Sequence, residues 1–204
     1  MSPTAARFAA TRYGCRVTGI DLTADFVAAG RTLNGWTGLD GRVTLETGSA
    51  LSLPYSDGAF DAAWMLHVGM NIADKTALAR EAARVLRPGG TFGIYDIMRA
   101  GETEPEYPVP WATTVETSAL EPPAEYRRVL ELAGLSVADV DDRSDFARGF
   151  FERLQAASAG RRGPPPLGLH LVMGPTAAQK YGNMVAGVTA GHLKPVEIVA
   201  RKPA

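Results

Sequence analysis

The sequence has little that would support disulfide, metal or membrane chemistry. It holds one cysteine, Cys15, and three histidines among 204 residues. A lone cysteine excludes an internal disulfide and any site built from several cysteines. No apolar run approaches the ~20 residues that cross a bilayer, and the N-terminal segment lacks the apolar centre of a secretion signal. These absences predict a soluble cytosolic protein.

The chain also lacks an excess of charge of either sign. Lysine and arginine number 21 against 22 aspartates and glutamates, which gives a formal net charge of −1. A general attraction to nucleic acid or to an anionic membrane is therefore not expected. We expect a small-molecule partner instead. The length and the 46% of hydrophobic residues suit one domain with a buried core.

Strand-like and helical segments alternate along most of the chain. Short apolar or β-branched runs predict strands at 16–20, 43–47, 60–66, 91–98, 135–140 and 196–200. Helical patterns lie between them and begin at Pro3, Leu22, Asp74 and Pro122, with Pro88 to Gly90 expected to end the third. This alternation indicates an α/β fold, a Rossmann-like parallel sheet with helices on both faces.

Two consecutive helical patterns interrupt the alternation near the end of the chain. The first is the aromatic stretch Phe146–Leu154 and the second covers 177–188, with a glycine and proline break at 163–166 between them. We expect a two-helix insertion, residues 144–192, over the active-site side of the sheet. The aromatic stretch and Trp111 suit an apolar or cationic ligand, although an aromatic stripe at helical spacing is more often core packing.

In a parallel sheet, ligands bind outside the carboxyl ends of the strands. Asp21 follows the first predicted strand, where its carboxylate can accept both hydroxyls of a ribose or can cap the next helix, as Thr23 also can. Gly48, Ser49 and Ala50 follow the second strand. These residues either let the backbone approach the edge of an adenine closely or simply form a turn.

His67 follows the strand at 60–66 and is the one histidine that this pattern places at the sheet edge. It can act as a general base, donate a hydrogen bond to a substrate, or close a pocket wall. His170 and His192 have no cysteines or acids at ligand spacing, so no metal site is predicted.

These motifs resemble the class I S-adenosylmethionine-dependent methyltransferases, particularly the branch that acts on amines, tocopherol-like phenols or sterols. The resemblance is carried by the segments 17–21, 48–55, 57–61 and 84–90. It implies an antiparallel last strand and S-adenosylmethionine as the cofactor.

The resemblance also assigns site residues. It implies that Asp21 binds the cofactor ribose, that Ser49 and Ala50 contact the adenine, and that His67 lies between the cofactor and the acceptor. Leu22 and Gly48 complete the predicted cofactor-binding set. Many relatives have an acid in the place of Ser49, so adenine recognition here is expected to use the hydroxyl and the backbone.

The family begins with a strand and a glycine-rich loop, which this sequence does not show. Such a loop precedes its acid by about 20 residues, and counting back from Asp21 reaches residue 1. We therefore expect residues 1–204 to form a methyltransferase-like domain without the first strand. Because that strand is central, its neighbours 16–20 and 60–66 would pair directly, accept another chain between them, or leave a poorly stable fragment. The fragment is the outcome we expect.

The leading functional hypothesis is an enzyme that transfers a methyl group from S-adenosylmethionine to a small-molecule acceptor. Catalysis would mostly be positioning, with His67 as the candidate catalytic base. The alternative is a non-catalytic methyltransferase-like remnant or fragment that has lost cofactor binding. A nucleotide-binding oxidoreductase ranks last because no G-x-G-x-x-G precedes Asp21.

Overall fold

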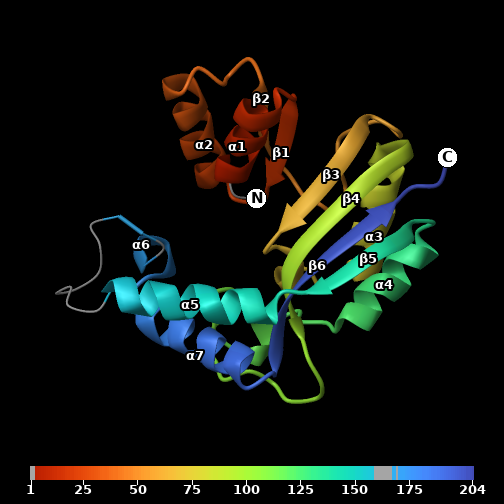
Figure 1. Ribbon diagram of the computed structural model, residues 1–204. Coiled ribbons are helices and arrows are strands. Elements are labelled where there is room, and N and C mark those ends of the chain that lie inside the picture. The colour runs from red at the N-terminus through yellow and green to blue at the C-terminus, as the bar shows by residue number, and fades with distance from the viewer. Residues whose placement is uncertain (1–2, 159–166, 169) are drawn as a thin grey trace.

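The computed structural model describes residues 3–158, 167–168 and 170–204 and has an α/β fold (Figure 1). Its strands are β1 (Val17–Asp21), β2 (Val43–Thr47), β3 (Phe60–Leu66), β4 (Leu86–Arg99), β5 (Ser136–Asp142) and β6 (Leu193–Arg201). Its α-helices are α1 (Pro3–Tyr13), α2 (Ala24–Trp36), α3 (Lys75–Val85), α4 (Pro123–Leu132), α5 (Ser144–Ser158), α6 (His170–Met173) and α7 (Ala177–Thr189). Short 3-10 helices cover Gly69–Asn71 and Val115–Thr117.

The strands form two separate sheets. β1 and β2 pair in parallel, and the second sheet has the order β3-β4-β6-β5. Within it β3 and β4 are parallel, whereas β6 runs antiparallel to both β4 and β5. The antiparallel last strand is confirmed, but the direct pairing of 16–20 with 60–66 that the sequence left open does not occur.

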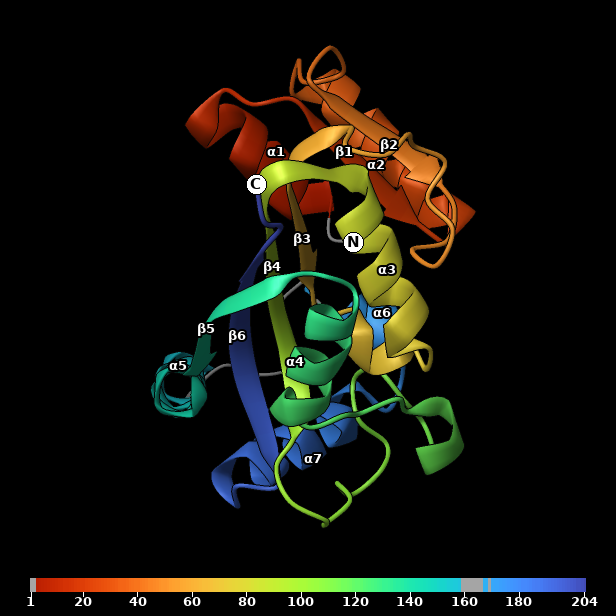
Figure 2. The ribbon, with the colours of Figure 1, turned by 90° about the vertical axis from the view of Figure 1, so that its right-hand side faces the viewer.

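Each sheet has its own apolar core. α1 and α2 pack against the β1–β2 pair around small and branched side chains, among them Ala6, Ala10, Val17, Val27, Val43 and Leu45. α3 and α4 lie together on one face of the four-stranded sheet (Figure 2), over a larger core that includes Leu78, Leu86, Ile94, Tyr126, Leu130 and Ile198. Because two cores hold the two sheets, the split is compatible with a folded chain.

A third core joins the C-terminal helices to the sheet. It contains Ala147 of α5, Val188 of α7 and Met70 beside the end of β3, and Trp111 and Phe151 pack against it. The expected pair of helices is present as α5 and α7, and α6 is an additional short helix. Phe146, Phe150 and Leu154 remain exposed, so only part of the aromatic stripe is core. The predicted break at 163–166 lies outside the described residues.

The third helix ends earlier than the sequence predicts. α3 ends at Val85, and Leu86 to Gly90 belong to β4 instead of serving only to stop the helix. The reason is pairing with the chain end, since Gly89 N donates to Lys202 O (2.9 Å) and Lys202 N donates to Gly90 O (2.8 Å). In the described part of the chain, no helix is long and apolar enough to span a bilayer.

Candidate functional site

Asp21 and the turn Gly48 to Ala50 lie side by side at the carboxyl ends of β1 and β2. The Gly48 amide donates to the Asp21 carbonyl (2.9 Å), and a Cβ on Gly48 would overlap the Ile20 side chain. A larger residue here would therefore require the end of the Ile20 side chain to move. The structure brings together two groups that the sequence reasoning assigned to one ligand, although their roles stay predictions.

Two side chains of this region accept hydrogen bonds from amides two residues further along the chain. Asp21 Oδ1 accepts from the Thr23 amide (2.9 Å), and Ser49 Oγ accepts from the Leu51 amide (3.1 Å). This bond closes the turn that leads into α2, whose N-cap residue is Thr23, so it is not the helix cap that the alternative interpretation of Asp21 expected. Leu22 is 74% exposed beside it, and its side chain is open to contact with a ligand.

The loop after this turn is held by an ion-paired arginine. Arg84 donates to the carbonyls of Leu53 (2.9 Å) and Tyr55 (2.6 Å) and pairs with Asp57 (2.9 Å). Glu81 Oε2 accepts from the Leu53 amide (2.7 Å) and from Arg84 Nη2 (2.8 Å). The motif at 84–90 thus positions the segment 53–57, a role that the sequence alone did not indicate.

His67 lies directly after β3 in a left-handed backbone conformation, with φ of 53°. Among the described residues it is the one non-glycine residue with positive φ, a conformation that is costly for most side chains and is concentrated at functional sites. Its amide donates to the Tyr95 carbonyl (2.8 Å), and its ring meets the Tyr95 ring edge to face at 5.0 Å. Desolvation by the surrounding protein holds the pKa of His67 below its ordinary value, so the neutral imidazole is favoured.

A buried polar cluster of Lys75, Asp96 and Tyr126 fixes the segment that carries His67. Asp96 Oδ2 accepts from Tyr126 Oη (3.0 Å) and from the Met70 amide (3.1 Å). Lys75 Nζ donates to the carbonyls of Ile72 (2.5 Å) and Ala119 (2.7 Å). Both charged side chains are almost wholly buried.

Burial sets the ionisation of this cluster. It raises the pKa of Asp96 to about 6, against the hydrogen bonds from Tyr126 and Met70, and it lowers the pKa of Lys75. The sequence reasoning missed these residues. The signal that was available is an acid inside the otherwise apolar run 91–98, because an unpaired carboxylate is rarely placed in a buried strand.

A pocket of about 160 Å³ separates the two halves of the candidate site. Its walls are the facing edges of β1 and β3, and its lining is mainly apolar. At the carboxyl ends of the strands it reaches Ile20 and Ala50 on one side and Leu66 and Val68 on the other. The pocket thus adjoins the neighbours of Asp21 and of His67 without bringing those two residues into contact.

Residues 3–94 match the family described as "Methyltransferase domain". Methyltransferase GfsG of Streptomyces halstedii is 32% identical over 146 residues, which span 70% of this chain and 52% of that protein. The glycine/sarcosine/dimethylglycine N-methyltransferase of Actinopolyspora halophila is 30% identical over 142 residues, 70% of this chain and 25% of that protein. The chain therefore spans about half the length, or less, of these two relatives.

The fold is also that of solved methyltransferases. Geranyl diphosphate C-methyltransferase from Streptomyces coelicolor A3(2), solved with Mg2+, geranyl diphosphate and S-adenosyl-L-homocysteine, matches with a TM-score of 0.74 at 21% identity. The match covers 96% of this chain and 66% of that chain. At this identity the likeness establishes the Rossmann-like fold.

Proposed function

Because the chain belongs to the class I S-adenosylmethionine-dependent methyltransferases, we propose that it transfers a methyl group from that cofactor to a small-molecule acceptor. One observation of the fold carries the proposal. Asp21 at the end of β1 lies beside the glycine-containing turn at the end of β2, because its main-chain carbonyl accepts from the Gly48 amide, and this arrangement is suited to a nucleoside.

The chemistry of these residues fits the nucleoside part of the cofactor. In our proposal Asp21 accepts hydrogen bonds from the ribose hydroxyls, and the exposed Leu22 covers one side of the nucleoside. Gly48, Ser49 and Ala50 face the adenine with main-chain groups and one hydroxyl. The fixed position of segment 53–57, held by Arg84, keeps that side of the site in shape.

In our proposal His67 serves the acceptor side of the site. The bound cofactor supplies a methyl group that is already activated by the sulfonium, so the protein mainly has to orient the acceptor and exclude water. A neutral His67 at the end of β3 can accept a proton from an acceptor that arrives protonated. The buried cluster below it keeps the segment 67–72 in place.

The C-terminal helices supply the cover for an acceptor. We assign residues 144–192 to an insertion over the active-site side, because α5 and α7 share a core with Met70 and Ile97 near the ends of β3 and β4. The relatives named above include an N-methyltransferase of small amino acids and a C-methyltransferase of geranyl diphosphate. Glycine with its N-methyl derivatives, and geranyl diphosphate, are therefore the first acceptors to test.

The test is binding of S-adenosylhomocysteine, measured by calorimetry, followed by methyl transfer from labelled S-adenosylmethionine to both acceptor classes. Asp21→Ala should weaken binding tenfold or more, since hydrogen bonds to a charged group contribute ~1.5–3 kcal/mol each. Asp40→Ala, which removes an exposed acid from the loop before β2, is the matched control. Equal affinities of the two variants would remove Asp21 from the site, and binding without transfer to any acceptor would favour the non-catalytic alternative.

A further inference from the structure

Lys75 is a buried cation to which the proposed function assigns no contact with cofactor or acceptor. It is the first residue of α3 and is only 4% exposed. This position disfavours an ammonium group twice, because burial removes it from water and because the amino end of a helix is the positive end of the helix dipole. The stability of α3 therefore does not explain a lysine here, and the explanation lies in its contacts outside the helix.

The ammonium of Lys75 bonds to two segments that are far apart in the sequence. Nζ donates to the carbonyls of Ile72 (2.5 Å) and Ala119 (2.7 Å), and it lies 5.5 Å from the centre of the Tyr126 ring. Burial lowers the pKa of Lys75, an effect opposed by the charges of Glu121, Asp96 and Glu125. These partners compensate the buried charge and fix the ammonium between the two segments.

The second of these segments is the loop 100–122, which joins β4 to α4. Its residue Ala119 uses its amide as well as its carbonyl, because the amide donates to the Met70 carbonyl (2.8 Å). Both main-chain groups of Ala119 are thus bonded to Lys75 or to the segment 67–72, which begins with His67.

The loop 100–122 also carries Trp111. The Trp111 Nε1 donates to Ser118 Oγ (3.1 Å), directly before Ala119 in the sequence. The indole packs against the core that contains Met70 together with residues of α5 and α7. The position of Trp111 relative to His67 therefore depends on how the loop is attached to the segment 67–72.

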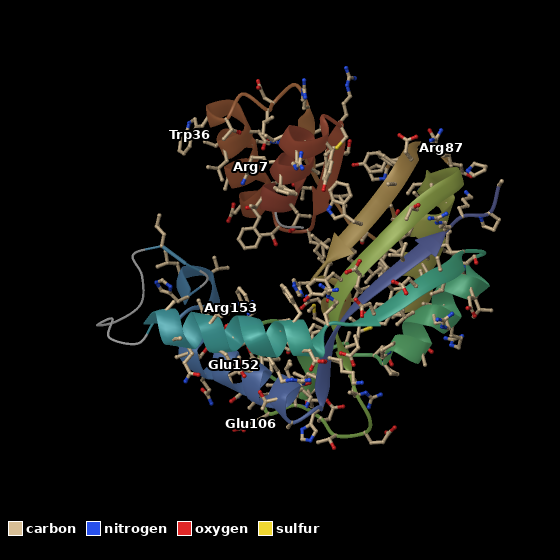
Figure 3. The ribbon with its side chains drawn as sticks, in the orientation of Figure 1. Arg7, Trp36, Arg87, Glu106, Glu152 and Arg153 are labelled. Atoms are coloured by element: carbon tan, nitrogen blue, oxygen red, sulfur yellow. The ribbon has the colours of Figure 1, made fainter. Side chains whose placement is uncertain are left out.

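The far part of the loop contacts the C-terminal helices. The side-chain amide of Asn183 on α7 donates to the Pro108 carbonyl (3.1 Å), and Figure 3 shows Glu106 of the loop near α7. The loop thus links the helices that we assign to the cover of the acceptor with the segment that carries the candidate base.

Asp96 holds the segment 67–72 as well, but it does not hold the loop. Its Oδ2 accepts from the Met70 amide (3.1 Å) and from Tyr126 Oη (3.0 Å), and Tyr126 belongs to α4. In the described part of the chain, Lys75 is the one side chain that hydrogen-bonds to both the segment 67–72 and the loop 100–122.

We propose that Lys75 is a positioning residue for the acceptor side of the site, which ties the loop 100–122 to the segment 67–72 and so fixes Trp111 relative to His67. The inference rests on the proposed function in one respect, that the acceptor binds at His67. Asp21 and the turn at Gly48 lie at the ends of β1 and β2 and share no hydrogen bond with Lys75. Loss of Lys75 therefore affects the acceptor and leaves cofactor affinity unchanged.

The first test is the variant Lys75→Met, whose side chain has a similar length without the ammonium. Amide hydrogen exchange measured by NMR should become about tenfold or more faster at Met70 and Ala119, because their segments separate more often. The amides of Ile94 and Ile198, paired between β4 and β6 in the core, report global unfolding and should keep their rates.

Lys202→Met is the matched control. The Lys202 ammonium also donates to two main-chain carbonyls, those of Ala83 (2.8 Å) and Leu86 (2.7 Å), but at the other end of α3. This variant loses the same kind and number of hydrogen bonds, and exchange at Met70 and Ala119 should stay as in the wild type.

The second test follows the imidazole of His67 by NMR titration. Burial holds the pKa of His67 below 6.5, so a looser segment should let in water and raise that pKa towards 6.5. Since loss of the Lys75 charge alone would also raise it, Ala119→Pro is measured beside Lys75→Met. It keeps the charge and removes the amide that bonds to Met70, and the extended backbone of Ser118 (φ −105°, ψ 131°) suits a residue before proline.

The third test compares acceptor and cofactor. With glycine, its N-methyl derivatives or geranyl diphosphate as the acceptor, Lys75→Met should lower kcat/KM for the acceptor about tenfold or more, since small displacements of reacting groups slow transfer strongly. The Kd of S-adenosylhomocysteine, measured by calorimetry, should stay the same in Lys75→Met and Lys202→Met.

Three results would overturn the proposal. Wild-type exchange at Met70 and Ala119 in Lys75→Met would mean that Lys75 does not tie the loop to the segment. Equal acceleration at Ile94 and Ile198 would mean that it supports the whole fold. A weaker Kd for S-adenosylhomocysteine would mean that its effect is not confined to the acceptor side. If the wild type transfers methyl to none of these acceptors, the proposed function fails, whereas exchange and the His67 titration still decide whether Lys75 holds the loop.

Discussion

Replacing Asp96 by asparagine should change how the stability of the protein depends on pH. The carboxyl group is buried in the cluster with Lys75 and Tyr126, and burial raises its pKa from an ordinary 3.8 to about 6. The folded protein therefore binds this proton more tightly than the unfolded chain does. The stabilisation that this provides is complete below pH 3.8 and is lost as the pH rises through about 6.

The size of the effect follows from the shift. At 1.36 kcal/mol for each pKa unit, the rise from 3.8 to about 6 corresponds to ~3 kcal/mol in the free energy of unfolding. The asparagine of the Asp96→Asn variant is neutral at every pH, and its amide oxygen can still accept from Tyr126 and from the Met70 amide. Any fixed cost of the substitution is independent of pH. The free energy of unfolding of the variant, relative to that of wild type, should therefore rise by ~3 kcal/mol between about pH 3.5 and 7.

The assay is urea unfolding at a series of pH values, followed by circular dichroism. Tyr126→Phe is the companion variant, because loss of its hydrogen bond should raise the pKa of Asp96 further and extend the pH dependence upward. A difference between wild type and Asp96→Asn that stays constant over this pH range would refute the reasoning, since it would mean that Asp96 titrates alike in the folded and unfolded chains.

The site carries three further predictions. The substitution His67→Asn introduces a side chain that tolerates positive φ, and it should lower turnover ~10²–10⁴-fold at nearly unchanged cofactor affinity. Because the pKa of His67 lies below its ordinary value of 6.5, the rate of the wild-type protein should fall only below pH 6.5. Gly69→Ala should destabilise the fold by ~1–3 kcal/mol through overlap with Asp96 and Tyr126, whereas Gly35→Ala meets open space and should not; thermal unfolding compares them. Arg84→Ala should speed proteolysis within 53–57, and unchanged cleavage there would contradict its role.

Local patterns predicted the strands well where both ends are marked in the sequence. The ranges 43–47 and 60–66 coincide with β2 and β3, because a turn or a glycine bounds each apolar run. The helical pattern after the first strand covers only Leu22 to Ala29, whereas α2 continues to Trp36. Its second half includes the buried Gly30 and Asn34, and Asn34 donates to the Val43 carbonyl (2.9 Å), a tertiary contact that no helical pattern shows.

Part of the candidate site could likewise be predicted from the sequence, and part could not. The position of Asp21 beside the turn at Gly48 follows from strand order alone, because adjacent parallel strands end at the same edge. The roles of Arg84 and Asp96 do not follow, since they depend on which helix covers which face and on the path of the loop at 53–57. Such residues are identified only when three separate parts of the chain are placed in space.

The division of the strands into two sheets shows what spacing along the sequence can and cannot predict. The sequence left open whether 16–20 pairs directly with 60–66, and among the described residues β1 pairs with β2 while β3 pairs with β4. Spacing along the sequence could not predict that β1 and β3 stay apart. Each is supported by its own core, β1 by the core with α1 and α2 and β3 by the core with α3 and α4. Since Asp21 ends β1 and His67 follows β3, the relative position of the two halves of the candidate site depends on how these two cores are placed, which no local sequence pattern shows.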